Sequence, residues 1–152
     1  MASNMDRRTA LTLIAAGVAL PTPLPARTGK SAKDLVAAYA DAWARRDLDA
    51  ILACMGEGVR FIGPNVKADG RAAYRASTSR FLKLVERVNV RAQVHRGNRA
   101  MLAYDFVCRD PIGTAPVAEL VQIADGRICS SEIFFDTAPF ASFARASSGQ
   151  LQ

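Results

Sequence analysis

The sequence has few side chains that could hold a metal ion or build a disulfide framework. Its 152 residues include one histidine, His95, and three widely spaced cysteines without a CxxC pair. A single histidine excludes zinc sites built on two or more histidines. Three scattered cysteines do not form the paired framework of a small disulfide-rich domain. We therefore expect no bound metal, and cysteines that pack as small apolar side chains.

Motifs for nucleotide and nucleic-acid chemistry are also missing. The sequence contains no Gly-rich phosphate loop, nucleophile elbow or metal-binding motif. The net charge is +6, but lysine and arginine are scattered, with no run of five or six basic residues. Scattered basic residues are typical of a solvated surface. We therefore expect no nucleic-acid partner and no cofactor.

The apolar run near the N-terminus is too short to cross a membrane. Residues 10–20 are mostly apolar, whereas a spanning helix needs about 20 apolar residues. Arg7 and Arg8 precede the run, and prolines and small residues follow it, which is typical of a secretory signal peptide and resembles a bacterial twin-arginine signal. We expect residues 1–26 to direct export, leaving residues 27–152 in the periplasm or secreted, without stable membrane insertion. A helix packed on the domain, or an uncleaved anchor, is the alternative.

Three helices are predicted in the first half of the mature chain. Ser31 followed by Asp34 is a variant of the capping box, and Asp47 is a good N-cap for a second, shorter helix. The pattern of residues 71–85 indicates a third helix. The first helix has an apolar face that repeats every four positions, formed by Leu35, Tyr39 and Trp43.

The second half changes from the helical period to strict alternation, which indicates strands. A short strand at 59–62, stopped by Gly63 and Pro64, precedes the third helix. Turn residues separate the later strands, which are predicted at 88–96, 99–109, 115–124 and 127–136. Grouped helices followed by hairpin-linked strands predict one α+β domain, with three helices packed on one face of a curved antiparallel sheet.

The order and spacing of several segments resemble the nuclear transport factor 2-like superfamily, which includes SnoaL-like polyketide cyclases and ketosteroid isomerases. The segments that carry the resemblance are 39–52, 59–61, 70–74, 125–128 and 133–136. Together they span about residues 31–140, which we take as the domain core. The resemblance implies a cone-shaped sheet around a hydrophobic pocket. It also implies a homodimer formed through the sheet.

Glu119 is the strongest candidate for a functional residue. In its strand it shares one face with Val117, Val121 and Ile123. A carboxyl on an apolar face is desolvated, and desolvation raises its pKa, so that it can donate a hydrogen bond to a ligand oxygen. An acid paired with an arginine, or burial of the opposite face, is the alternative.

Tyr39 is the second candidate, on the resemblance. It falls on the position of the isomerase's oxyanion-hole tyrosine, and Glu119 falls close to that enzyme's oxyanion-hole aspartic acid. The sequence departs from the isomerase at the general base, whose position Gly63 occupies. A core aromatic is the alternative reading of Tyr39.

Two other carboxyls are candidate bases. Asp105 falls near an aspartate that epoxide hydrolases of this superfamily use, although Ala103 stands where they have a partner arginine. Glu132 depends on the hairpin register: a two-residue turn places it opposite Glu119, and a bulged loop turns it to the other face. The sequence leaves the register open.

We expect an apolar pocket for a small cyclic or polycyclic molecule, with Glu119 as its polar anchor. The predicted walls are Trp43, Phe61, Tyr74, Phe81, Tyr104 and Phe134, together with Tyr39. An enzyme built this way would be a metal-free isomerase, cyclase or dehydratase that works by proton transfer. A non-catalytic module that binds hydrophobic ligands, or a dimeric assembly module, is the alternative.

Overall fold

The computed structural model describes residues 31–142, so the predicted export signal lies outside the described residues. The helices are α1 (Ala32–Ala44), α2 (Leu48–Cys54) and α3 (Arg71–Leu82). The strands are β1 (Met55–Gly63), β2 (Val66–Asp69), β3 (Val85–Arg96), β4 (Arg99–Cys108), β5 (Thr114–Ala124) and β6 (Arg127–Phe135). In this part of the chain no helix is both long enough and apolar enough to cross a bilayer.

Both predicted helix starts are confirmed by their caps. The Ser31 hydroxyl accepts a hydrogen bond from the Asp34 N–H at 3.2 Å. The Asp47 carboxylate accepts one from the Ala50 N–H at 3.0 Å. Each cap satisfies a backbone donor that has no partner inside its helix, so the sequence fixes where α1 and α2 begin.

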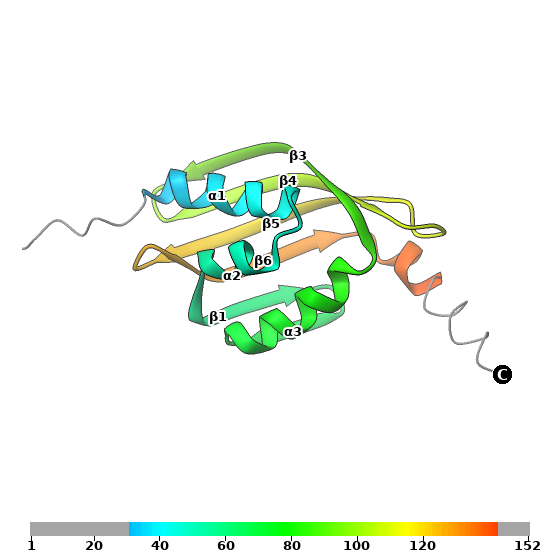
Figure 1. The fold of residues 1–152 in the computed structure, drawn as a ribbon. Helices are drawn as coiled ribbons and strands as arrows, with labels where there is room; N and C mark the ends of the chain where they lie inside the picture. The colour runs from blue at the N-terminus through cyan, green and yellow to red at the C-terminus, as the bar shows by residue number, and fades with distance from the viewer. Residues whose placement is uncertain (1–30, 143–152) are drawn as a thin grey trace, which may run out of the picture.

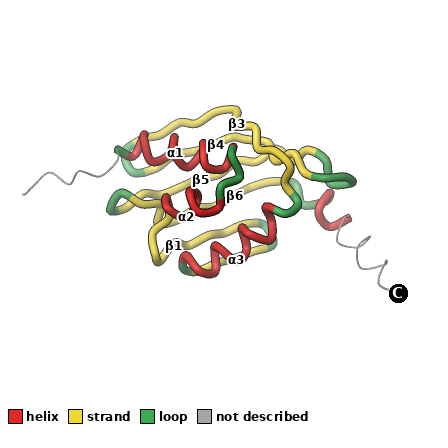
Figure 2. The backbone as a smooth tube through the Cα atoms, in the orientation of Figure 1, coloured by secondary structure: helices red, strands yellow, loops and turns green. Residues whose placement is uncertain are grey.

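The six strands form one curved, unclosed sheet with the order β2-β1-β6-β5-β4-β3. The helices lie across one face of this sheet (Figures 1 and 2), which confirms the predicted α+β class. Two details differ from the antiparallel meander predicted. β1 pairs with β6 in parallel, which makes the sheet mixed. The chain also returns after Gly63 as β2, because Pro64 and Asn65 form a hairpin turn across which Gly63 pairs with Val66.

The register of the last hairpin combines the two alternatives predicted for it. Asp125 and Gly126 have φ values of 52° and 69° and form a two-residue turn, so that Ala124 pairs with Arg127. A bulge then leaves Cys129 unpaired in β6. One extra residue moves every following side chain of β6 to the opposite face of the sheet. Glu119 therefore pairs with Ile133 instead of Glu132.

The core lies between the helices and the concave face of the sheet. The alternation predicted for β5 is confirmed, because the four residues of one parity are all buried: Val117, Glu119, Val121 and Ile123. The inward residues of β4 face the same side, and Trp43 of α1 packs on Phe106 with ring centroids 5.4 Å apart. Apolar burial of this kind is the main stabilising term of the fold.

Replacing Asp47 with Ala removes the cap of α2. We expect the free energy of unfolding to fall by about 1 kcal/mol, because the Ala50 N–H loses its acceptor. Chemical denaturation measures this change. Asp41→Ala is the control: it removes an exposed ion pair to Arg45, which contributes about 0.3–0.5 kcal/mol. Equal losses in the two variants would contradict the capping role.

Candidate functional site

A cavity of about 300 Å³ lies between α1, α3 and the concave face of the sheet. Six of the seven aromatic walls predicted from the sequence line it: Tyr39, Trp43, Phe61, Tyr74, Phe81 and Tyr104. Phe106 and Phe135 complete the aromatic lining. The cavity is therefore a predominantly apolar space of the size that binds a small cyclic molecule.

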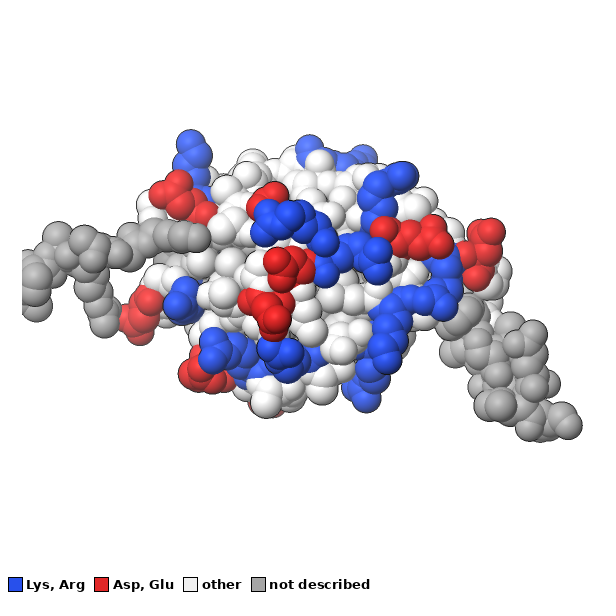
Figure 3. Space-filling model, viewed as in Figure 1, with Lys and Arg blue, Asp and Glu red and all other residues white. Residues whose placement is uncertain are grey.

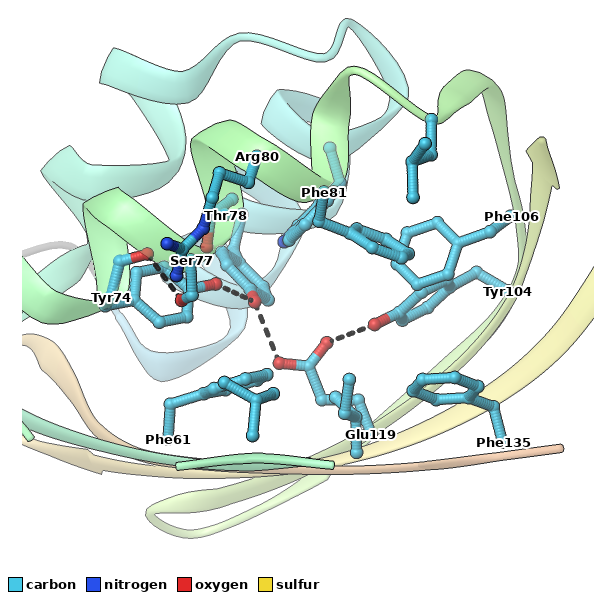
Figure 4. A pocket seen from close by; sticks show the side chains of 15 residues that line it. Phe61, Tyr74, Ser77, Thr78, Arg80, Phe81, Tyr104, Phe106, Glu119 and Phe135 are labelled. Carbon is cyan, nitrogen blue, oxygen red and sulfur yellow. Dashed lines mark hydrogen bonds between the residues drawn. The ribbon is translucent and has the colours of Figure 1, made fainter. Parts of the chain in front are cut away.

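Glu119 reaches this cavity from the middle of β5 and is 1% exposed. Its Oε1 accepts hydrogen bonds from the hydroxyls of Tyr39, at 2.8 Å, and Ser131, at 2.6 Å. Its Oε2 accepts one from the hydroxyl of Tyr104, at 2.8 Å. Figure 4 shows the carboxyl between the tyrosine hydroxyls, above the sheet and facing α3. Tyr39 and Glu119 thus meet in one site.

Two opposing effects act on the pKa of Glu119. Burial raises the pKa above its ordinary value of 4.5, because the charged form loses its hydration. The three hydroxyl donors lower it by stabilising the carboxylate, and the effect of burial is larger. Burial and the nearby carboxyl also raise the pKa of Tyr39 and Tyr104, so both phenols keep their protons and act as donors.

The carboxylate keeps room for one further partner. A carboxylate has about four lone-pair positions on its two oxygens. Oε1 uses two of them for Tyr39 and Ser131, whereas Oε2 accepts only from Tyr104 among the described residues. Oε2 is therefore the atom of Glu119 best able to accept a proton or a hydrogen bond from a ligand.

Two more polar groups belong to the cavity lining. The hydroxyls of Tyr74 and Tyr39 lie 3.2 Å apart, which extends the network toward α3. Trp43 lines the cavity with its ring, and its buried Nε1–H has no acceptor in residues 31–142. A buried donor without a partner costs about 1–3 kcal/mol.

The structure corrects three placements predicted from the sequence. Phe134 is 50% exposed and lies on the convex face, because the bulge at Cys129 turns Phe135 into the cavity instead. The same bulge turns Glu132 outward, opposite Leu120. Asp105 also faces outward, where it pairs with Arg91 at 3.3 Å. Neither carboxyl lies with Glu119.

Sequence reasoning missed Ser131, which donates the shortest of the three hydrogen bonds to Glu119. Its orientation depends on the bulge, and the only local signal is the pair of small polar residues Ser130 and Ser131 in β6. Tyr104 was predicted as a wall and also proves to be a hydrogen-bond donor.

Gly63 occupies a position with little room for a side chain. A Cβ there would lie 3.0 Å from Cγ1 of Val66 and 3.4 Å from Cγ1 of Ile133, and both residues line the cavity. The space in which the resemblance places a general base is therefore filled by apolar side chains. Across residues 31–142, no three His, Cys, Asp or Glu side chains are grouped as around a metal ion.

Comparison with known proteins agrees with this architecture. A family model described as SnoaL-like domain matches residues 36–131. A solved protein of Kribbella flavida is 31% identical, with a TM-score of 0.69 over 76% of this chain and 95% of that chain. A putative polyketide cyclase from Sinorhizobium meliloti is 22% identical, with a TM-score of 0.61 over 66% of this chain and 94% of that one.

A putative ketosteroid isomerase, also from Kribbella flavida, shares the fold at 18% identity. Its TM-score is 0.63, over 72% of this chain and 81% of that chain. No curated protein sequence matches the chain. At these identities the cyclase and the isomerase show a common fold, so the chemistry must be argued from the cavity itself.

Glu119→Gln should change how stability depends on pH. Because the folded-state pKa is raised above the ordinary 4.5, the folded chain binds more protons than the unfolded chain between the two values. The stability that this proton supplies is fully present below pH 4.5 and is lost as pH rises through the folded-state pKa.

The readout is the free energy of unfolding of the wild type minus that of Glu119→Gln, from urea denaturation at several pH values. We expect this difference to fall with rising pH, by about 1.4 kcal/mol for each unit by which the pKa is raised. Any pH-independent cost of the altered hydrogen bonds cancels in this slope. A difference that stays flat or rises would contradict the raised pKa.

Proposed function

The chain belongs to the SnoaL-like domain family, and we propose that it binds a small cyclic or polycyclic molecule and transfers a proton on it. The observation that carries the proposal is Glu119, a buried carboxyl that lines an apolar cavity. A proton acceptor shielded from water in this way has a pKa closer to neutrality, where acid–base catalysis is most effective. The reaction classes that fit are isomerisation, cyclisation and dehydration.

Glu119 takes the role of the base in this proposal. Asp105 and Glu132 lie on the convex face, so within residues 31–142 Glu119 is the only carboxyl that lines the cavity. Its Oε2 accepts a proton from a carbon next to a ligand carbonyl. The electron pair of the broken C–H bond forms a C=C bond, the π pair of the carbonyl moves to its oxygen, and the proton later returns to the ligand.

The hydroxyl network supports both steps. While Glu119 is charged, Tyr39 and Tyr104 donate to it and hold it in place. Once Glu119 has accepted the proton, its oxygens are weaker acceptors. A phenol such as Tyr39 is then available to donate to the new anion on the ligand, which is where stabilisation is needed.

Binding without catalysis is the second candidate. Gly63 leaves the isomerase's base position empty of functional groups, and three hydroxyls of the chain itself already satisfy Glu119. A carrier or sensor needs only the apolar cavity and one polar anchor. The experiment must therefore separate proton transfer from binding.

The test uses 5-nitrobenzisoxazole, a small aromatic probe whose ring opens when a base removes its C3 proton. The N–O bond breaks, and a coloured cyanophenolate forms. We expect the full chain to catalyse this reaction, and the rate to rise with pH toward a plateau as Glu119 loses its proton, with a midpoint above 4.5. Glu119→Gln should lower the rate at least about 100-fold, because the base is removed.

The matched control is Glu132→Gln, which makes the same substitution on the convex face of the neighbouring strand. It should keep the wild-type rate. A Glu119→Gln protein that folds normally and remains fully active would rule out Glu119 as the base. A wild type that binds the probe but leaves it intact would favour the carrier or sensor instead.

We further propose that the domain acts after export, in the periplasm or outside the cell. The support is the sequence of residues 1–26, with its paired arginines and short apolar run. Export remains a prediction, since these residues lie outside the described part of the chain.

Self-association is also proposed, through the convex face of the sheet. Val94, Met101 and Phe134 are 65%, 46% and 50% exposed there. Val94 pairs with Met101, and Met101 pairs with Leu120 across the next strand, so apolar residues form a band across β3, β4 and β5. Exposed apolar surface of this kind marks association sites. A homodimer would bury it.

Met101→Lys should shift the chain from dimer toward monomer, because it places a charge in the buried centre of the proposed interface. Sedimentation equilibrium of the full chain measures the shift. The control is Gln93→Lys, an exposed position on β3 that shares the concave side with Leu102. A wild type that remains monomeric at all concentrations would contradict the dimer.

A further inference from the structure

Arg80 is a cation at the cavity that has no partner in the described part of the chain. It lies in the last turn of α3, is exposed and belongs to the cavity lining. No hydrogen bond or ion pair joins its guanidinium to any other of residues 31–142, although its backbone carbonyl accepts a hydrogen bond from the Lys83 N–H. The other two arginines of α3 are paired, Arg71 with Glu57 and Arg75 with Asp49.

The difference between the unpaired Arg80 and the paired Arg71 and Arg75 is informative, because charges of both signs are interspersed on this side of the molecule (Figure 3). Within α3, carboxylates are in reach of the other two arginines, Arg71 and Arg75. A cation near a helix C-terminus does interact favourably with the helix dipole. That role, however, does not require the side chain to line a cavity.

The charges of the cavity lie in two different environments. Among the described residues that line the cavity, Arg80 and Glu119 are the only two with a chargeable carboxyl or guanidinium group. Glu119 is buried against the sheet, whereas Arg80 is exposed on α3. In the close-up, Arg80 runs along α3 on the opposite side of the cavity from the sheet that carries Glu119 (Figure 4). Aromatic side chains fill most of the lining between them.

We propose that the ligand is a cyclic carboxylate whose anionic group binds the Arg80 guanidinium while its ring occupies the cavity. This inference rests on the proposed function of the same cavity. Arginine suits a carboxylate because its planar group offers two parallel N–H donors. Binding at the exposed end also lets the carboxylate keep part of its hydration, which avoids the cost of burying a charge.

Repulsion between the Glu119 carboxyl and the ligand's own carboxylate also fixes the orientation of such a ligand. A carboxylate placed beside Glu119 would meet a like charge in an apolar site, which is strongly unfavourable. The ligand carboxylate therefore points to Arg80, and the opposite end of the ring system approaches Oε2 of Glu119. Proton transfer then takes place at a carbon remote from the carboxylate, not at the carbon next to it.

The test compares 2-naphthoate with 2-naphthamide, which has nearly the same shape but no charge. Fluorescence titration of the full chain gives the dissociation constant of each probe. We expect the wild type to prefer naphthoate, and Arg80→Gln to weaken naphthoate binding about fivefold while naphthamide binding is unchanged. Arg80→Lys should retain part of the preference, since it keeps the charge but loses the two-point contact.

The matched control is Lys83→Gln, which removes the same charge less than one helical turn away at an exposed residue outside the cavity lining. It should leave both constants unchanged. An unchanged ratio of the two constants in Arg80→Gln would overturn the role of Arg80. Retained naphthamide binding and an active Glu119 base would show that the proposed function survives that result. Failure of the wild type to bind either probe would overturn both.

Discussion

The hydrogen bonds that three hydroxyls donate to Glu119 are the constraint on which the site depends. A carboxyl as deeply buried as this one destabilises the fold unless its oxygens have partners. The partners come from three elements: Tyr39 from α1, Tyr104 from β4 and Ser131 from β6. Satisfying one side chain of β5 therefore fixes how the first helix and both neighbouring strands sit around the cavity, and it explains how an open space persists inside a small domain.

This arrangement is a compromise between stability and reactivity. Fully solvated, Glu119 would be a weak base held in no particular direction. With more donors it would remain an inert carboxylate. Burial raises its pKa while the three hydroxyls partly restore it, so the group is oriented and is still able to change its protonation state. The tyrosines contribute without losing their own protons, because burial and the negative carboxyl raise their pKa as well.

Local signals predicted the parts of the fold that are decided locally. Ser31 and Asp47 marked the starts of α1 and α2 because a cap acts within one turn, and the alternation of β5 placed Glu119 inside because side chains alternate along any strand. The parallel pairing of β1 with β6 joins segments about 70 residues apart, and no short pattern records it. The bulge at Cys129 could not be predicted from a short pattern either. Its single extra residue placed Phe135 instead of Phe134 in the cavity lining and brought Ser131 to Glu119.

The number of carboxyls in the cavity limits the chemistry that fits it. Val66 and Ile133 fill the space next to Gly63, and no second carboxyl of the described residues lines the cavity with Glu119. In the proposed reaction, Glu119 as a lone base must give back the proton that it takes before it can act again, either to another carbon of the ligand or to a leaving group. Isomerisation and dehydration satisfy this requirement within one binding event. A reaction that needs a separate acid and base acting at the same moment does not, unless one of the hydroxyls around Glu119 supplies the acid.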